Sequence, residues 1–496
     1  MLGNSLAHMI ARLAGLGCGI VTIPLVTLTL GTEALGLLGV FATLQAILGL
    51  FDLGLPVIVN QRIAVMIGSN GTTRERAVFV RTLELLFWAM VVLFVVVGLS
   101  LCGQFSKSWL NVNTLSHANV SLALVVIVFT VAMRFPATFY SNVLFAYGRH
   151  IFPNAVTSTS AVLRTIMALI ALMCHQVGIV GFFVIQLIGT VVEVSLLAAG
   201  VWWLQTPRWV KPQWSLLSDI APMAAALSGV SLTAVVLSQV DKIVLSKSLS
   251  LGDFGLYTAA YTLAAGLVTL SYPVGNAVFP DFAREKDSIR PVLRRLVDRA
   301  VELTIIAVMP LGCVMVMQSE ALLRLLFLDK PIPQGLGGVL SLMALGGIAQ
   351  ALVTLPHLFQ VAVGNVAIVV RINLAFIVPY AAAVYLAGWY GVHAAATCFA
   401  ILNITRLFIH WSILIKDGRR LTWQLPIGLS LAATACGLIL AAIPAAFSIS
   451  GFTVLVVAVL SVPLLTLALA VLLPRSRERL WTLARLRFRN QNLGTK

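Results

Sequence analysis

The chain has 496 residues, of which 60% are hydrophobic and only 10% are charged, and its mean hydropathy is +1.01. A soluble domain exposes a polar surface that this composition cannot supply, which excludes a water-soluble enzyme or binding module. The formal net charge of +16 would suit a nucleic-acid-binding protein, so the placement of the basic residues along the chain has to be examined.

Apolar stretches of about 20 residues follow one another from Ser5 to Leu473, and each is long enough to cross a hydrocarbon core about 30 Å thick. In lipid each backbone polar group needs a partner within its own segment, so the stretches are predicted to be helices. The first stretch is too long for a signal-peptide core and lacks a basic leader, so we expect a retained helix. About 14 transmembrane helices are predicted, over residues 5–30, 36–61, 78–102, 116–142, 155–175, 179–204, 218–245, 255–283, 297–317, 334–358, 366–388, 391–414, 424–446 and 452–473.

The order of these stretches predicts an all-α integral membrane protein with two six-helix lobes and a C-terminal helix pair. Short matches recur about 216 residues apart, including Gly148 with Gly364 before the fifth and eleventh helices. An even number of helices per half gives both halves one orientation, as in the parallel repeats of rocking transporters. The predicted parts are an N-terminal lobe (1–205), a cytoplasmic linker (206–217), a C-terminal lobe (218–416), the helix pair (417–473) and a basic cytoplasmic tail (474–496).

The basic residues follow the predicted topology. With the N-terminus cytoplasmic, 24 of the 33 Lys and Arg fall in cytoplasmic loops, helix ends or the tail. This asymmetry is the positive-inside pattern and predicts that both termini are cytoplasmic, so the net charge reflects topology and not nucleic acid. The tail is expected to bind anionic membrane lipid. Interface anchors are predicted at Trp202, Trp203, Trp209, Trp389 and Trp411.

Ionisable side chains inside a bilayer are costly and usually face a protein interior or a watery cavity. At helical spacing, most of those in this chain lie on stripes of small or polar residues. The N-terminal half has three such arginines and two acids, whereas the C-terminal half has few charges. The candidates are Arg12, Arg134, Arg164 and Arg406 for an anionic ligand, and Asp52, Glu193 and Asp241 as cavity or ion-coupling acids.

Two interpretations of these charges stay open. Asp52 or Glu193 could pair with an arginine and hold the helices together. For the whole set, three arginines exceed two acids and leave positive charge that an anionic substrate would balance. Arginine suits that role because its planar fork of donors matches phosphate oxygens and stays charged in a dry site.

Several other activities have no support in the sequence. No Gly-Lys dipeptide occurs, which excludes a Walker A loop and therefore ATP hydrolysis by this chain. The six cysteines stand alone, so neither a disulfide framework nor a zinc site is indicated. No loop exceeds roughly 17 residues, which leaves no room for a soluble catalytic domain. No cofactor, metal or catalytic residue is therefore predicted, and His357, His393 and His410 are expected to be structural.

Three blocks of sequence resemble a known family. They are Val240-Asp-Lys-Ile-Val-Leu-Ser246, Asp253-Phe-Gly-Leu-Tyr-Thr-Ala-Ala-Tyr261, and Tyr272-Pro-Val with Val278-Phe-Pro-Asp-Phe-Ala-Arg284. Together they resemble the helix 7–8 signature of the polysaccharide transporters, which include the Wzx-type O-antigen and exopolysaccharide flippases of the multidrug/oligosaccharidyl-lipid/polysaccharide (MOP) superfamily. The segment from Gly36 to Leu55 resembles helix 2 of the same family.

The resemblance implies a flippase of the bacterial inner membrane that moves oligosaccharide repeat units on undecaprenyl diphosphate. It implies alternating access around a central cationic cavity, with a polysaccharide polymerase and a chain-length regulator as partner proteins. The physical argument agrees, because a diphosphate with a hydrophilic glycan cannot cross hydrocarbon unaided.

Three alternatives remain. A lipid II flippase would take a substrate of the same chemistry. A multidrug or cation exporter shares the architecture but needs an acidic site, where the first helix here has Arg12. A membrane glycan polymerase or ligase usually needs a long external loop, and the longest external segment predicted here is about residues 318–333.

Overall fold

The computed structural model describes residues 2–51, 55–69, 72–174, 177–204, 210–284 and 290–414. Fifteen α-helices account for nearly all of these residues, and they form ten segments long and apolar enough to cross a membrane, one of which joins α5 and α6. The chain is therefore an all-helical, multi-pass membrane protein, which confirms the fold class predicted from composition.

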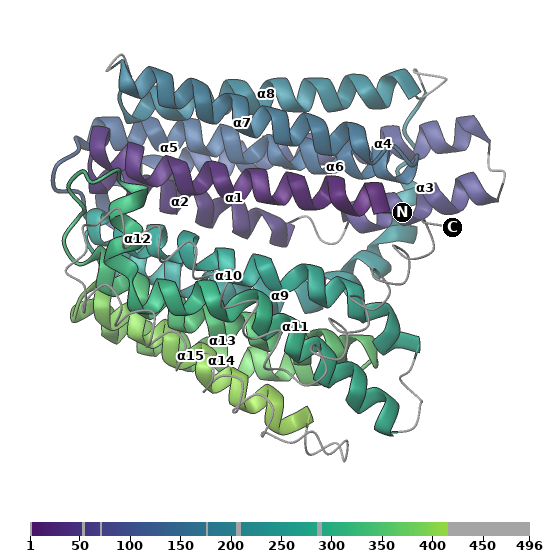
Figure 1. The fold of residues 1–496 in the computed structure, drawn as a ribbon. Helices are drawn as coiled ribbons and strands as arrows, with labels where there is room; N and C mark the ends of the chain where they lie inside the picture. Colours follow the sequence, from purple (N-terminus) through teal and green to yellow (C-terminus); the bar gives the residue numbers. More distant parts are fainter. Residues whose placement is uncertain are drawn as a thin grey trace, which may run out of the picture. The chain divides into compact units, whose positions relative to one another are not determined.

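The helices follow one another with short connections (Figure 1). Those of the first half are α1 (Leu2–Leu30), α2 (Thr32–Phe51), α3 (Leu55–Gly68), α4 (Thr73–Gln104), α5 (His117–Ala132), α6 (Arg134–Ala146), α7 (Ile151–Met173) and α8 (Ile179–Leu204). A π-helical turn, Phe105–Trp109, extends α4. The others are α9 (Ser215–Ser248), α10 (Leu251–Arg284), α11 (Arg290–Met317), α12 (Ser319–Leu326), α13 (Leu336–Ala362), α14 (Val366–Trp389) and α15 (Val392–Leu414).

Every predicted span up to residue 414 coincides with one of these helices or with two in succession. The span 116–142 is divided, because α5 ends at Ala132 and α6 begins at Arg134. Pro136 explains this break. It has no N–H to donate to the carbonyl four residues earlier, that of Ala132, and its ring clashes with that carbonyl. The predicted helices 424–446 and 452–473 and the basic tail lie outside the described residues.

The chain divides into two compact units. Unit 1 comprises Met1–Ala259 and Val370–Val392, and unit 2 comprises Ala260–Val369 and His393–Lys496. Helices α10 and α14 have residues in both units. The predicted lobes, 1–205 and 218–416, remain a prediction about how the carrier moves.

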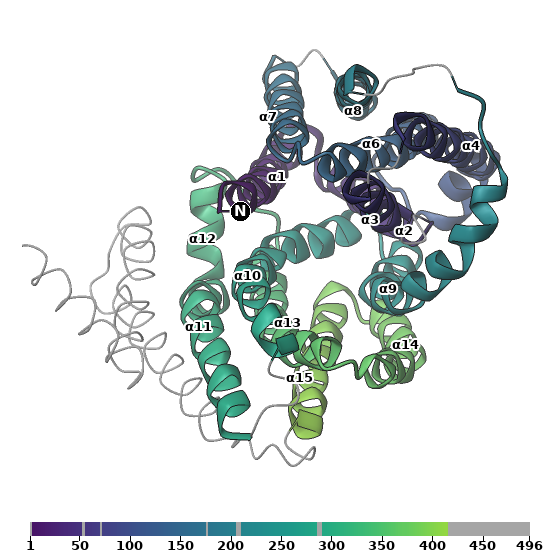
Figure 2. The ribbon, with the colours of Figure 1, turned by 90° about the vertical axis from the view of Figure 1, so that its right-hand side faces the viewer.

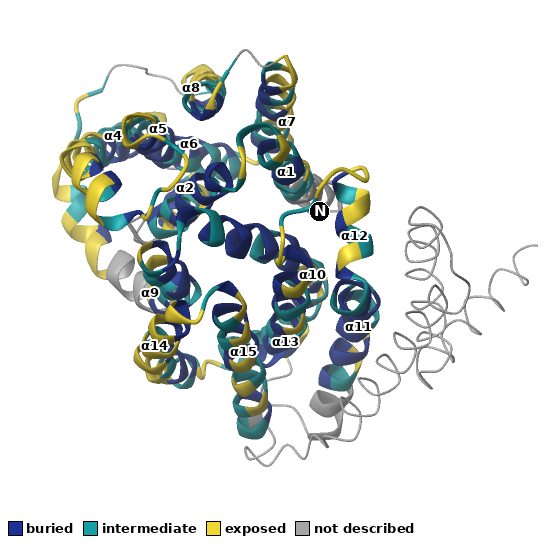
Figure 3. Ribbon diagram, turned by 90° about the vertical axis from the view of Figure 1, so that its left-hand side faces the viewer, coloured by how far each residue is buried: buried dark blue, intermediate teal, exposed yellow. Residues whose placement is uncertain are grey.

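In unit 1, α7 packs between α1 and α8, and α5 packs against both α4 and α8 (Figures 1 and 2). The outward faces of these helices are apolar, as in α7, where Leu163, Met167 and Ile170 are all more than half exposed. Figure 3 shows such exposed residues along the outer sides of α4 and α7. An exposed apolar stripe on a long helix is the surface that lipid covers, so the polar face of α7 is left for the protein interior.

Helices α2 and α10 approach closely within unit 1 because glycines line their contact. A Cβ added at Gly36 would collide with the backbone oxygen of Leu251, and one at Gly39 would lie 2.5 Å from Oγ1 of Thr258. Asn111, which follows the π-helical turn, binds the end of α9 just before this contact. Its side-chain amide donates to the carbonyl oxygens of Lys247 and Leu249 at 2.9 and 3.1 Å. Small residues let membrane helices pack at short range, so this junction is tightly fitted.

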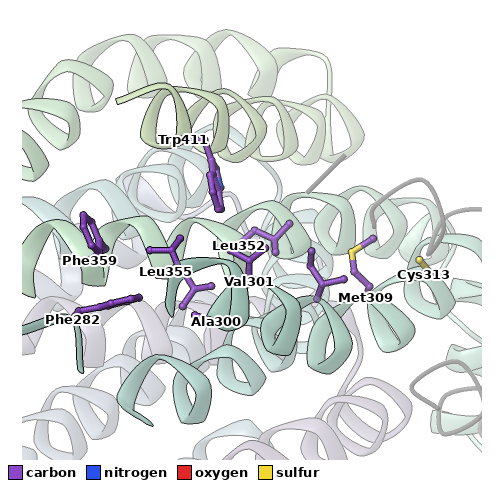
Figure 4. Close-up of a cluster of buried hydrophobic side chains, with 11 residues drawn as sticks. Phe282, Ala300, Val301, Met309, Cys313, Leu352, Leu355, Phe359 and Trp411 are labelled. Atoms are coloured by element: carbon purple, nitrogen blue, oxygen red, sulfur yellow. The ribbon is translucent and has the colours of Figure 1, made fainter. Parts of the chain in front are cut away.

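Unit 2 has its own hydrophobic core (Figure 4). Helices α10, α11, α13 and α15 contribute Phe282, Val297, Ala300, Val301, Ile305, Met309, Cys313, Leu352, Leu355, Phe359 and Trp411. Trp411 is only 4% exposed, so its prediction as an interface anchor is wrong: the indole fills the core instead of reaching the lipid boundary. Trp203 and Trp389 are exposed, as anchors require, and Trp209 lies outside the described residues.

The matched glycines Gly148 and Gly364 adopt the same turn. Both have positive φ, +74° and +84°, and both N–H groups donate to the carbonyl three residues earlier. In each turn the next residue, Arg149 or Asn365, donates to the carbonyl five residues earlier. This is the glycine C-cap that ends a helix in a left-handed residue. The shared geometry supports the internal repeat predicted from the sequence.

Candidate functional site

Arg134 is the first residue of α6 and follows the break that Pro136 introduces. Its side chain is 23% exposed, and Nη1 lies 3.4 Å from each carboxylate oxygen of Glu193 on α8. These contacts are long for a charge-assisted hydrogen bond, which is usually about 2.7–2.9 Å. Glu193 therefore orients the side chain of Arg134 but does not engage all of its hydrogen-bond donors.

Arg164 on α7 is held more tightly. Its Nη1 donates to Oγ1 of Thr190 at 3.0 Å and to Oε2 of Glu193 at 3.2 Å, and its side chain is 10% exposed. Thr190 and Glu193 are three residues apart on α8, so both lie on the face that α7 covers. The two polar groups fix the guanidinium on the inner side of α7, opposite the apolar stripe.

A glycine sets the distance between α7 and α8 at this point. A Cβ added at Gly189 would lie 2.9 Å from Cβ of Arg164. The carbonyl oxygen of Gly189 also accepts a hydrogen bond from Oγ of Ser160 at 3.0 Å. The small and polar residues that form stripes on α7 and α8 in the sequence therefore meet one another.

The electrostatic result is a cluster of three charged groups with a net positive charge. Two guanidiniums, Arg134 and Arg164, share the single carboxylate of Glu193, which is 1% exposed. The buried carboxylate offsets only one of the two cations. An anion with several oxygens could balance the second cation by binding to the exposed edge of Arg134.

Two predicted site residues fall at the limit of the described structure. The backbone of Arg12 lies in α1, which packs along α7, the helix of Arg164. The side chain of Arg12 lies outside the described part of the chain. Asp52, between α2 and α3, is not among the described residues. The interpretations of both stay predictions.

Asp241 lies apart from this cluster, in α9. Its carboxylate accepts a hydrogen bond from the hydroxyl of Tyr257 at 2.6 Å, and Nζ of Lys242 lies 3.1 Å from Oδ1. All three side chains are buried, and Lys242 also donates to the carbonyl oxygen of Ser238 at 2.9 Å. This carboxylate is therefore paired within unit 1.

Arg406 belongs to unit 2, on α15. One helical turn later, His410 is fully buried, and neither ring nitrogen has a hydrogen-bond partner among the described residues. The ring of His357 on α13 lies 6.5 Å from that of His410. Helical spacing places Arg406 and His410 on one stripe of α15, whereas the approach of His357 comes from the fold.

Glu84 on α4 is a buried acid that the sequence analysis did not select. It accepts hydrogen bonds from the hydroxyl of Tyr140 at 2.7 Å and from Nε1 of Trp202 at 3.1 Å. Arg81, three residues earlier, is 2.7 Å from its other oxygen. Glu84 lies inside the predicted span 78–102, so the rule that flags ionisable residues in spans would have found it.

Glu33, at the start of α2, is another buried acid that the sequence analysis did not select. Its carboxylate accepts three backbone N–H groups, those of Asn113, Thr114 and Leu115, at 2.7–2.8 Å. Successive N–H groups that point at one carboxylate form a small anion nest. The contact ties the segment before α5 to α2, and no local sequence signal indicates it, since the two parts are 80 residues apart.

Solved structures share this fold. A lipid II flippase, MurJ, in an inward closed conformation has a TM-score of 0.72 at 13% identity, covering 95% of this chain and 98% of that chain. An inward-facing multidrug resistance MATE family transporter of the MOP superfamily has 0.67 at 15% identity, covering 83% and 95%. A MOP superfamily transporter from Pyrococcus furiosus with a binding pocket of reversed polarity has 0.55 at 14% identity, covering 84% and 95%. At this identity the likeness concerns the fold.

No curated protein matches the chain. A family model, in contrast, matches its sequence directly. The model of the family described as "polysaccharide biosynthesis protein" matches residues 1–285, which include α1–α10 and therefore Arg134, Arg164 and Glu193. This match covers more than half of the chain, and the chain is accordingly a member of the polysaccharide biosynthesis protein family, with the fold of the MOP superfamily transporters.

Proposed function

We propose that this chain is a flippase that moves polyprenyl-diphosphate-linked oligosaccharide repeat units across the bacterial inner membrane. The product would supply synthesis of a surface polysaccharide such as O-antigen, capsule or exopolysaccharide. One observation is the main support: Arg134 and Arg164 share the single carboxylate of Glu193, inside a membrane protein of a polysaccharide biosynthesis family.

The proposed mechanism is alternating access of two lobes around this cationic site. The diphosphate enters from the cytoplasmic side and binds the exposed part of Arg134, while the polyprenyl chain stays in lipid. Arg164, fixed by Thr190 and Glu193, adds positive potential but few free donors. Movement of the lobes then exposes the headgroup to the outer side, and no covalent chemistry by the protein is required.

The alternatives differ in the charge of their ligands. A cation exporter requires an acidic site, whereas Glu193 is already shared by two arginines. A lipid II flippase takes a substrate of the same class, a polyprenyl diphosphate with a glycan, and the likeness to MurJ over 95% of this chain favours it as the second candidate. A glycan polymerase or ligase would need an external catalytic loop, which the predicted topology does not provide.

The test uses proteoliposomes with labelled polyprenyl-diphosphate oligosaccharide on one side. Wild-type protein should make the headgroup accessible from the other side, and Arg134→Ala should slow this about tenfold, the effect expected for loss of one charge-assisted contact. Arg134→Lys should recover only part of the rate, because lysine cannot bind two oxygens in one plane. Arg371→Ala, at an exposed arginine of α14, is the matched control. Headgroup accessibility equal to that of empty liposomes would contradict the proposal.

A further inference from the structure

A cavity of about 570 Å³ lies beside α12 in unit 2. The residues that line it are far along the chain from the arginine cluster of unit 1. This volume is within the range of about 300–1,000 Å³ that small-molecule sites occupy. Its walls come from α12, the connection 327–335 and the first turn of α13. The polar side chains that line it are Glu320, Arg324, Asp329, Lys330 and Gln334.

The charged side chains of this cavity form no ion pairs with one another among the described residues. Glu320 and Arg324 are four residues apart on α12, a spacing that favours an ion pair on a helix. No ion pair or hydrogen bond of either side chain occurs among the described residues, and the same holds for the side chains of Asp329 and Lys330. Two carboxylates and two cations are thus available to a ligand.

The walls are fixed rather than loose. The connection turns through Leu328 and Asp329, two non-glycine residues with φ of 51° and 58°. Such residues persist in the left-handed region only where their surroundings hold them. Here the N–H of Asp329 donates to the carbonyl oxygen of Arg324 at 2.8 Å, and Phe327 is fully buried beneath the turn. The hydroxyls of Ser319 and Ser341, 2.9 Å apart, join α12 to α13.

Two glycines of the lining, Gly337 and Gly338, let neighbouring side chains pack closely against α13. A Cβ added at Gly337 would lie 2.9 Å from Cγ of Glu320, and one at Gly338 would lie 2.9 Å from Nε2 of His393. A side chain at Gly337 would therefore displace Glu320, which lines the cavity, and one at Gly338 would displace His393 behind it. Pro331 and Pro333 stiffen the remaining edge, since each has a fixed φ.

The chemistry of the lining selects the ligand. Two carboxylates would repel a diphosphate, and Arg324 and Lys330 would repel a cation, so the formally neutral lining suits an uncharged ligand. Such a ligand must both donate to carboxylates and accept from cations, and hydroxyl groups do both. The lining has no aromatic or long aliphatic side chain to hold a polyprenyl tail, apart from Ile332.

We propose that this cavity binds the neutral saccharide part of the transported lipid-linked oligosaccharide, separately from its diphosphate. The inference rests on the proposed function. The predicted topology places the connection 318–333 outside the membrane, so the cavity would hold the glycan after the headgroup has crossed. The arginine cluster recognises the diphosphate common to such substrates, and this second site recognises the sugar.

The experiment measures binding of the free oligosaccharide released by mild acid from the host's own lipid-linked repeat unit. Calorimetric titration into the full chain in lipid nanodiscs should show saturable binding to the wild type. Glu320→Gln and Arg324→Gln should each weaken it about tenfold, as expected for loss of a hydrogen bond to a charged group. Lys107→Gln, an exposed cation on the same predicted side, is the matched control.

Melting curves establish that the variants are folded, and Lys330→Gln replaces any variant that is not. Unchanged affinity in folded variants, or binding of inorganic diphosphate in place of the oligosaccharide, would overturn the inference. Transport by the wild type is measured in parallel. If the wild type transports but the oligosaccharide does not bind at this cavity, only this inference fails. If the wild type does not transport, the proposed function fails.

Discussion

At the scale of single residues, the environment of Glu193 determines what each arginine can do. The carboxylate is almost fully buried and is shared by two guanidiniums that differ in exposure. Arg164 is fixed by two partners within the bundle, whereas Arg134 has only long contacts and a more exposed edge. We infer that Arg164 mainly positions the cluster and that Arg134 meets the ligand.

Glu193→Gln should destabilise the protein. Removal of this carboxylate leaves the buried Arg164 and the half-buried Arg134 without the counter-charge that they share among the described residues, and breaking a buried pair typically costs about 3–5 kcal/mol. We expect a lower melting temperature in detergent than for Asp219→Asn, which neutralises an exposed carboxylate. A Glu193→Gln protein with wild-type stability would indicate that the arginines find another counter-charge.

At the scale of helices, Pro136 determines where Arg134 lies. Because Pro136 ends α5 at Ala132, Arg134 is the first residue of a separate helix, α6. A continuous helix would rotate the guanidinium relative to Glu193. The break, and not the apolar stripe alone, therefore sets the geometry of the cluster.

Pro136→Ala should extend α5 into α6 and slow transport while the protein stays folded. Pro153→Ala is the matched control, since Pro153 is in the first turn of α7, where its missing N–H has no partner within the helix. Transport by both variants in proteoliposomes, with melting curves, checks this. Equal rates for the two variants would show that the break has no role in transport.

The contact of α2 with α10 gives a second prediction at this scale. Gly36→Ala should lower the free energy of unfolding by about 1–3 kcal/mol, the usual cost of overpacking, because its new methyl group meets the backbone of Leu251. Gly49→Ala on the same helix has nothing within 4 Å and should be neutral or slightly stabilising. Denaturation midpoints of the two variants in the same detergent compare them directly. Similar midpoints would mean that α2 moves to accommodate the methyl group.

At the scale of the whole molecule, the topology remains the prediction on which transport direction depends. The positive-inside pattern places residues 62–77 in the cytoplasm and residues 318–333 outside. Cys174 is a free, exposed cysteine at the predicted outer end of its helix, so the assay uses a Cys174→Ser background. In that background a membrane-impermeant maleimide added to intact spheroplasts should label Lys330→Cys, whereas Arg74→Cys should react only after permeabilisation. Both side chains are exposed, so the two variants differ only in the side of the membrane. The reverse labelling would invert the orientation.

Hydrophobicity alone determined the helices of this protein and its class, because lipid permits a continuous backbone only as helix. Local spacing likewise placed Arg134, Arg164 and Glu193 on inward stripes. The sequence could not predict which acid pairs with which base, because a stripe of polar residues marks one face of a helix but not the helix that packs against that face. Glu193 therefore proved to be shared, Asp241 paired with Lys242, and Glu84 lay in a network that no stripe marked. The cavity beside α12 is lined only by residues between 320 and 338, but its shape depends on the left-handed turn at Leu328 and Asp329, which the sequence does not mark because neither residue is a glycine.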